Sequence, residues 1–149
     1  RYAAWKKVWG KGYEAGELIL SDRYTTSNAV HQGGKLSQEK QPAFFDWLFD
    51  FEYHKLGLPA PDAVIYLDMP TGESVKLLRA RESATHTKGD IHEVDADYLA
   101  ACRKTAQLAA KHCGWQRVSC VDEDGRLRSI EDIHQEIWAL VSRSISTLQ

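Results

Sequence analysis

The sequence has 149 residues, of which 43% are hydrophobic, and it contains five Trp, six Tyr and four Phe. This length and apolar content suit one domain over residues 1–149 and exclude intrinsic disorder for most of the chain. The 19 Lys and Arg against 21 Asp and Glu give a net charge of −2, which favours neither a nucleic acid polymer nor a membrane as partner. No apolar run approaches the roughly 18 residues of a membrane span and no secretory signal opens the chain, so a cytoplasmic protein is expected.

The first part of the chain predicts a short helix, a strand and a long aromatic helix. The helical spacing of apolar residues at the N-terminus stops at Gly10 and Gly12, so the first helix is expected to end there. Residues 18–20, Leu-Ile-Leu, form a short apolar run before a charged cluster, which predicts a strand buried on both faces of a parallel sheet.

The long helix is predicted over residues 37–56, and it carries more apolar surface than one sheet face covers. Phe44, Leu48 and Phe51 are separated by four and three residues, which places them on one helix face. Neighbouring Phe residues widen this stripe. A second packing partner is therefore expected, which favours a homodimer.

The rest of the chain alternates strands and helices. The predicted elements, in chain order, are a strand over residues 63–67, a helix over 71–81, a helix over 93–113, a strand over 115–120 and a helix after an approximate capping box of Ser129 and Asp132. Such alternation predicts an α/β fold with a parallel sheet, whose ligands lie beyond the carboxyl ends of the strands.

Polar side chains crowd the segment that follows the first predicted strand. The Arg23 guanidinium suits bidentate contact with a phosphate, and the Asn28 amide can donate to and accept from the edge of a base. A structural reading stays open, in which Asp22 pairs with Arg23 or caps the next helix.

These residues resemble a known family. Asp-Arg-Tyr at 22–24, followed by Ser-Asn-Ala at 27–29 and a ring at His31, resembles the DRY segment of bacterial thymidylate kinases. The strand and helix up to residue 82, and the segment Asp-Ile-His-Glu at 90–93, resemble that family's next strand, its lid region and the residues after the lid. The resemblance covers essentially the whole chain in the right order.

The resemblance implies an acceptor site for thymidine monophosphate. Arg23 would bind the phosphate as a catalytic residue, and Asp22 would help to place Mg²⁺ and its waters. Asn28 would contact the pyrimidine edge and Arg1 the thymine O4. His31 stands where the family often has a Tyr beside the sugar.

The resemblance also implies an ATP site. Arg79 would stack on the adenine, and Arg81 would serve the lid, which is expected over residues 82–92. Asp90 and Glu93 would lie near the sugar and the metal, although each also suits the first turn of a helix.

The sequence contains no Gly-x-x-x-x-Gly-Lys-Ser/Thr loop, which in kinases of this type cradles the phosphates of ATP. Residues 33–37, Gly-Gly-Lys-Leu-Ser, have the wrong spacing. The resemblance therefore implies a parallel sheet of the P-loop NTPase type, flanked by helices and incomplete, without its first strands and P-loop. We expect these 149 residues to be inactive alone.

Two other functions fit the same residues. One is a related deoxynucleoside or nucleoside monophosphate kinase, which would phosphorylate a different acceptor. This alternative stays open because His31 replaces the Tyr that the family often has beside the sugar. A non-catalytic scaffold protein would keep only the nucleotide cleft or the dimer face. An upstream reading frame that encodes a P-loop would separate the kinases from the scaffold.

Overall fold

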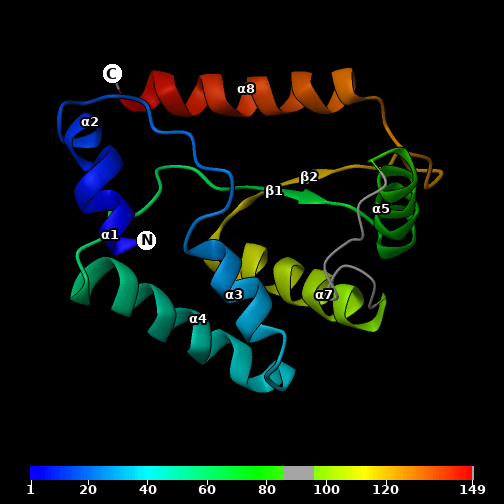
Figure 1. Ribbon diagram of the computed structural model, residues 1–149, viewed down its shortest axis with the longest axis horizontal. Coiled ribbons are helices and arrows are strands. Elements are labelled where there is room, and N and C mark those ends of the chain that lie inside the picture. The colour runs from blue at the N-terminus through cyan, green and yellow to red at the C-terminus, as the bar shows by residue number, and fades with distance from the viewer. Residues whose placement is uncertain (86–95, 149) are drawn as a thin grey trace. The chain divides into compact units, whose positions relative to one another are not determined.

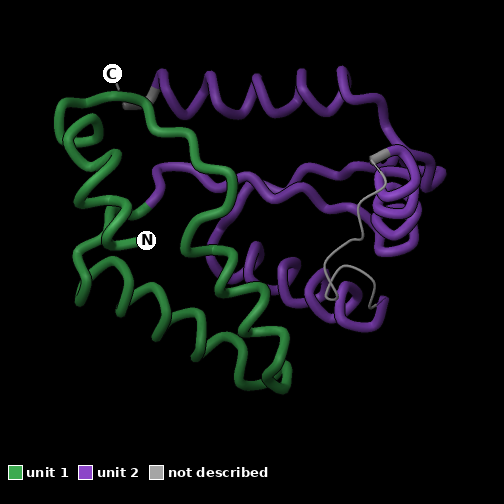
Figure 2. The backbone as a smooth tube through the Cα atoms, viewed as in Figure 1, with its two compact units in different colours: residues 1–60 green, residues 61–149 purple. Residues whose placement is uncertain are grey.

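The computed structural model describes residues 1–85 and 96–148. Figure 2 shows two compact units, residues 1–60 and residues 61–149. The described residues hold a parallel two-stranded sheet together with helices, so the α/β class is confirmed (Figure 1). One domain over residues 1–149 stays a prediction.

The first unit begins with a helix that passes through its glycines. It runs through α1 (Tyr2–Ala4), the π-helical stretch η1 (Trp5–Trp9) and α2 (Gly10–Glu14). The predicted end at Gly10 and Gly12 is therefore wrong. Gly10 is buried where the helix widens, and a Cβ atom there would lie 2.5 Å from the carbonyl oxygen of Trp5. Glycine at this position serves close packing of the helix backbone.

Residues 18–20 form no strand, so that prediction is wrong too. The segment is exposed rather than buried on two faces, with Leu18 76% and Leu20 94% accessible. A strand needs backbone hydrogen bonds to a neighbouring strand. Within the described residues, both strands of the sheet belong to the unit of residues 61–149, so residues 18–20 have no strand to pair with. An apolar run predicts burial only where such a neighbour exists.

The aromatic segment is helical as predicted. Between residues 26 and 55 the first unit contains α3 (Thr26–Gly33), η2 (Gln38–Lys40), α4 (Gln41–Phe49) and η3 (Asp50–Lys55). The buried face, however, runs through Phe45, Leu48 and Glu52 rather than through Phe44 and Phe51. Because the helix is aromatic around much of its circumference, periodicity alone did not select the buried face.

The second unit is built on the strands β1 (Ile65–Asp68) and β2 (Gln116–Ser119). They pair in parallel, with Ile65 opposite Gln116 and Asp68 opposite Ser119. In Figure 1, α7 (Ala96–Cys113) and α8 (Ile130–Leu148) lie on either side of this pair. The buried core of the unit includes the fully buried Val118 of β2 and small side chains of α7, namely Cys102, Ala106, Ala109 and Ala110.

The predicted helix start at residue 71 and the predicted helix end at residue 113 are confirmed, whereas the predicted helix start at residue 93 lies outside the described residues. The capping box is present, because the backbone N–H of Asp132 donates to Ser129 Oγ at 3.0 Å. The helix α5 (Thr71–Thr85) extends beyond the predicted end at residue 81 into the predicted lid, of which residues 86–92 lie outside the described residues. No described helix is both long and apolar enough to cross a membrane.

Candidate functional site

Arg23 has an unusual backbone conformation. Its φ of 67° lies in the left-handed region, which residues other than glycine rarely adopt. The hydroxyl of Ser21 donates to the Arg23 carbonyl at 3.1 Å and so stabilises this turn. Backbone strain of this kind persists where the surrounding structure fixes it, and it is concentrated at functional sites.

The side chain of Arg23 lies along one face of α3. Its Nε donates to Ser27 Oγ at 3.1 Å, and its Nη2 lies 2.9 Å from His31 Nε2. Ser27 and His31 are one helical turn apart and therefore share a face. A guanidinium has five N–H donors, of which these contacts use two. The remaining donors have no protein partner within the described residues, so the exposed guanidinium is open to an oxyanion.

Asp22 and Asn28, which lie near Arg23 in the sequence, also have polar groups without a partner among the described residues. Asp22 is exposed and Asn28 is half-buried. Among the residues described, neither the Asp22 carboxylate nor the Asn28 side-chain amide has a hydrogen-bond partner. The structure thus leaves both groups available to a ligand near Arg23.

Asp22 fits a supporting role toward Mg²⁺. This ion keeps several waters and binds through one or two carboxylates together with substrate phosphates. Asp22 directly precedes Arg23 in the sequence, and its single exposed carboxylate has that chemistry. Across the described ranges, no group of three or more His, Cys, Asp or Glu could hold a metal ion by itself.

Arg1 is engaged within the first unit. Its Nη2 forms a short ion pair with Oε1 of Glu52, whose side chain is 8% exposed. Tyr24 lies in the same polar cluster, and burial, followed by the neighbouring Tyr53 and Glu52, raises the pKa of Tyr24 to about 12. The Tyr24 hydroxyl therefore stays protonated and donates to the Pro59 carbonyl at 3.1 Å. The sequence did not predict Glu52 as the partner of Arg1.

The residues predicted to bind ATP belong to the second unit. Arg79 and Arg81 lie on α5 and are exposed, and the Arg79 guanidinium has no partner among the described residues. Asp90 and Glu93 lie outside the described residues. The structure therefore brings Arg23 together with His31 and leaves the predicted ATP site untested.

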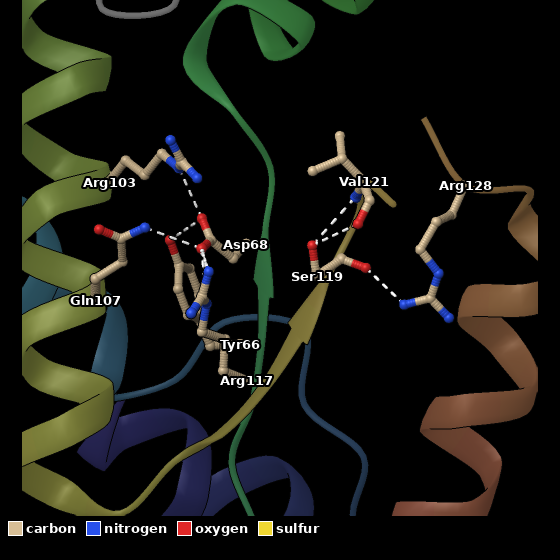
Figure 3. Close-up of polar contacts among 8 residues, drawn as sticks. All are labelled: Tyr66, Asp68, Arg103, Gln107, Arg117, Ser119, Val121 and Arg128. Atoms are coloured by element: carbon tan, nitrogen blue, oxygen red, sulfur yellow. Dashed lines mark hydrogen bonds and ion pairs between the residues drawn. The ribbon is translucent and has the colours of Figure 1, made fainter. Parts of the chain in front are cut away.

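A buried carboxylate that the sequence did not predict as a site lies at the end of β1. Asp68 is 1% exposed and accepts hydrogen bonds from two arginines and a glutamine (Figure 3). Arg103 Nε donates to Oδ1 at 2.7 Å, and Gln107 Nε2 donates to Oδ2 at 2.9 Å. Arg117 Nε donates to Oδ2 at 2.7 Å. These side chains come from α7 and β2, so one carboxylate joins three elements.

The environment of Asp68 keeps it ionised. Burial alone would raise its pKa, but the hydrogen bonds from Arg103 and Gln107 and the charges of Arg103 and Arg117 outweigh burial and lower it. The phenol of Tyr66 also donates to Asp68 at 3.3 Å, and burial, then this carboxylate, raises the pKa of Tyr66. Because its donors come from the protein itself, the cluster is a structural junction. An acidic residue at the end of an apolar strand was its only sequence signal.

Several curated proteins are similar in sequence to this chain. A probable thymidylate kinase of Thermococcus onnurineus is 28% identical over 137 residues, which are 89% of this chain and 55% of the relative. A probable thymidylate kinase of Pyrococcus abyssi is 27% identical over 146 residues, 94% of this chain and 59% of the relative. A thymidylate kinase of Limosilactobacillus fermentum is 28% identical over 127 residues, which are 85% of this chain and 56% of the relative. The chain is similar to thymidylate kinases.

This similarity confirms the resemblance that the motifs predicted. The chain spans 55–59% of the length of these three thymidylate kinases. No protein-family model and no solved structure matches it significantly. The reaction and the substrates of the whole protein are therefore proposals.

Proposed function

We propose that the chain is part of a thymidylate kinase, an enzyme that transfers the γ-phosphoryl group of ATP to thymidine monophosphate. The proposal rests on one observation. In the segment that resembles the DRY motif, Arg23 is fixed by Ser27 and His31 and still has free N–H donors. The similarity to thymidylate kinases over most of the chain supports the same assignment.

The acceptor site is proposed around Arg23. Its guanidinium would bind the acceptor phosphate through charge-assisted hydrogen bonds, which are shorter and stronger than neutral ones. Asn28 would contact the pyrimidine edge with its free amide. Arg1, held by Glu52, would present its remaining donors to the thymine O4, and Asp22 would bind waters of Mg²⁺.

The donor site is proposed on four residues within the range 61–149. Arg79 would stack on the adenine of ATP, Arg81 would serve the lid, and Asp90 and Glu93 would lie near the sugar and the metal. Phosphoryl transfer depends on positioning and on charge stabilisation, which a glycine-rich loop provides in kinases of this type. The 149 residues contain no such loop. The sheet is therefore proposed to be of the P-loop NTPase type, without the P-loop and the first strands.

A homodimer is proposed through the exposed side of α4 and η3. Phe44 stacks on Trp47 with ring centroids 5.9 Å apart, and Trp47 stacks on Phe51 at 5.7 Å. Trp47 is 57% and Phe51 40% exposed within the chain. A second copy that covers these rings would remove apolar surface from water.

Binding selectivity tests the proposed function. The 149-residue chain would be titrated by calorimetry with thymidine monophosphate, uridine monophosphate and adenosine monophosphate. Because the Asn28 amide suits a pyrimidine edge and the resemblance is to thymidylate kinases, we expect the tightest binding for thymidine monophosphate. Equal affinities for all three nucleotides would contradict an acceptor site for thymidine monophosphate.

A further inference from the structure

We propose that His31 is a positioning residue that holds the Arg23 guanidinium ready for an oxyanion, and that it acts on the phosphate group through Arg23. This inference deepens the proposed function and rests on it. It differs from the role that the resemblance implies for His31, which is a contact with the sugar.

The contact between the two side chains has one consistent arrangement of protons. A guanidinium carries only donors, so Arg23 Nη2, which lies 2.9 Å from His31 Nε2, must be the donor. Nε2 therefore accepts with its lone pair, and the proton of the neutral ring is on Nδ1. The imidazole acts here as a hydrogen-bond acceptor that fixes one end of the guanidinium.

His31 is the second of two contacts that fix the guanidinium. Ser27 Oγ accepts a hydrogen bond from Arg23 Nε at 3.1 Å. With this contact alone, the guanidinium plane could still turn about the Nε–Oγ hydrogen bond. The contact from His31 to Nη2 removes this freedom. An arginine side chain loses much rotamer entropy when it is ordered, so a guanidinium ordered before binding loses less when an anion binds.

The geometry also sets the direction of the free donors. The two contacts occupy Nε and one N–H of Nη2, which face α3. Both N–H groups of Nη1 and the second N–H of Nη2 point away from these acceptors. A pair of N–H groups on two terminal nitrogens matches two oxygens of a phosphate. The left-handed backbone of Arg23, at a φ of 67°, belongs to the same fixed arrangement.

A double-mutant cycle on the 149-residue chain tests this role. The ligands are thymidine monophosphate and thymidine, and the variants are His31→Phe, Arg23→Ala and the double variant. We expect His31→Phe to weaken binding of thymidine monophosphate about tenfold, as for loss of one hydrogen bond to a charged group. Its affinity for thymidine stays unchanged. In the Arg23→Ala background, His31→Phe has no further effect on either ligand.

Conservative variants separate the proposed role from general damage to the fold. In His31→Gln the amide oxygen can accept from Arg23, so the affinity for thymidine monophosphate returns toward that of the wild type. His31→Ala repeats the test without the bulk of Phe. Gln32→Ala, an exposed neighbour on α3, is the control for changes to the helix and leaves both affinities unchanged.

The opposing outcomes are distinct. If His31→Phe and His31→Ala weaken thymidine and thymidine monophosphate equally, His31 contacts the nucleoside or supports the fold, and the positioning role is wrong while the proposed acceptor site stands. If the wild-type chain binds thymidine monophosphate no more tightly than thymidine, Arg23 binds no phosphate, and both proposals fail.

Discussion

Arg117 Nε donates to Asp68 Oδ2 at 2.7 Å and so joins β2 to the last residue of β1. The two residues are 49 positions apart in the sequence, and the carboxylate is 1% exposed. Loss of one partner from a buried ion pair leaves an uncompensated charge in the protein. The Asp68 cluster is therefore where the second unit should be most sensitive to pH and to substitution.

Asp68→Asn should destabilise the second unit by about 3 kcal/mol. This is the low end of the cost of breaking a buried ion pair, because Arg103 and Arg117 remain partly exposed to water. Amide hydrogen exchange at Gln116 and Cys120, whose N–H groups donate across the sheet, would measure the loss. Asp62→Asn, at an exposed position, is the control. Equal protection in both variants would contradict the structural role of Asp68.

The contribution of Asp68 to stability should depend on pH with a defined sign. Its pKa is lowered in the folded state, so its contribution is fully present above the unfolded value of about 3.9. The contribution is lost as the pH falls from there through the lower folded pKa. The difference in unfolding free energy between wild type and Asp68→Asn should therefore be constant near neutral pH and shrink below about pH 4. Urea titrations at a series of pH values would reveal a constant difference if this assignment is wrong.

Two glycines in the first helix should respond oppositely to alanine. At Gly10 a Cβ atom would meet the carbonyl oxygen of Trp5 at 2.5 Å, and this backbone atom moves only with the helix, so Gly10→Ala should cost about 1–3 kcal/mol. At Gly12 the nearest atoms belong to the flexible Glu17 side chain, so Gly12→Ala should gain about 0.5–1 kcal/mol of helix propensity. Thermal unfolding would measure the stability of both variants. A Gly10→Ala variant more stable than the wild type would contradict the close approach of residue 10 to the Trp5 carbonyl oxygen.

Asn28→Ala should weaken binding of thymidine monophosphate by about 1–3 kcal/mol through loss of the contact with the base. Affinity for deoxyribose 5-phosphate, which has no base, should not change, because Arg23 retains its donors. Calorimetric titration of both ligands checks this. An equal loss for the two ligands would mean that Asn28 is structural.

The chain should sediment as a dimer at micromolar concentration. Combined Trp47→Ser and Phe51→Ser substitutions remove two rings of the exposed aromatic stack and should shift the equilibrium to monomer. Trp138→Ser, which removes a ring that is 60% exposed on α8, should leave the dimer intact. A wild-type chain that sediments as a clean monomer would remove the basis of the homodimer proposal.

Local signals predicted much of the second unit. Ser129 with Asp132 marked the start of α8, and the predicted helix end at residue 113 is the end of α7, where Gly114 follows at a φ of 71°. The apolar strand after residue 62 was recognised, although its bounds shifted by up to two residues. These features depend on neighbours in sequence, which is why they could be predicted.

Features that depend on distant neighbours could not be predicted. The run at residues 18–20 has the composition of a buried strand, but a strand also needs a pairing partner, which the sequence pattern does not reveal. The buried face of α4 and the convergence on Asp68 likewise depend on contacts between elements. At the candidate site the motif predicted Arg23 and His31 separately, whereas their direct contact came from the fold.

The most direct test of the proposed function compares three chains for their preference for a phosphate group. The affinities of wild type, Arg23→Ala and Arg126→Ala would be measured for thymidine monophosphate and for thymidine. Arg126 is an exposed arginine paired with Asp124, and it serves as the matched control for loss of one positive charge. We expect the wild type and Arg126→Ala to prefer the monophosphate, and Arg23→Ala to lose about 1.5–3 kcal/mol of binding to it with thymidine unaffected. If Arg23→Ala prefers the monophosphate over thymidine as strongly as the wild type does, Arg23 is not the residue that binds the phosphate.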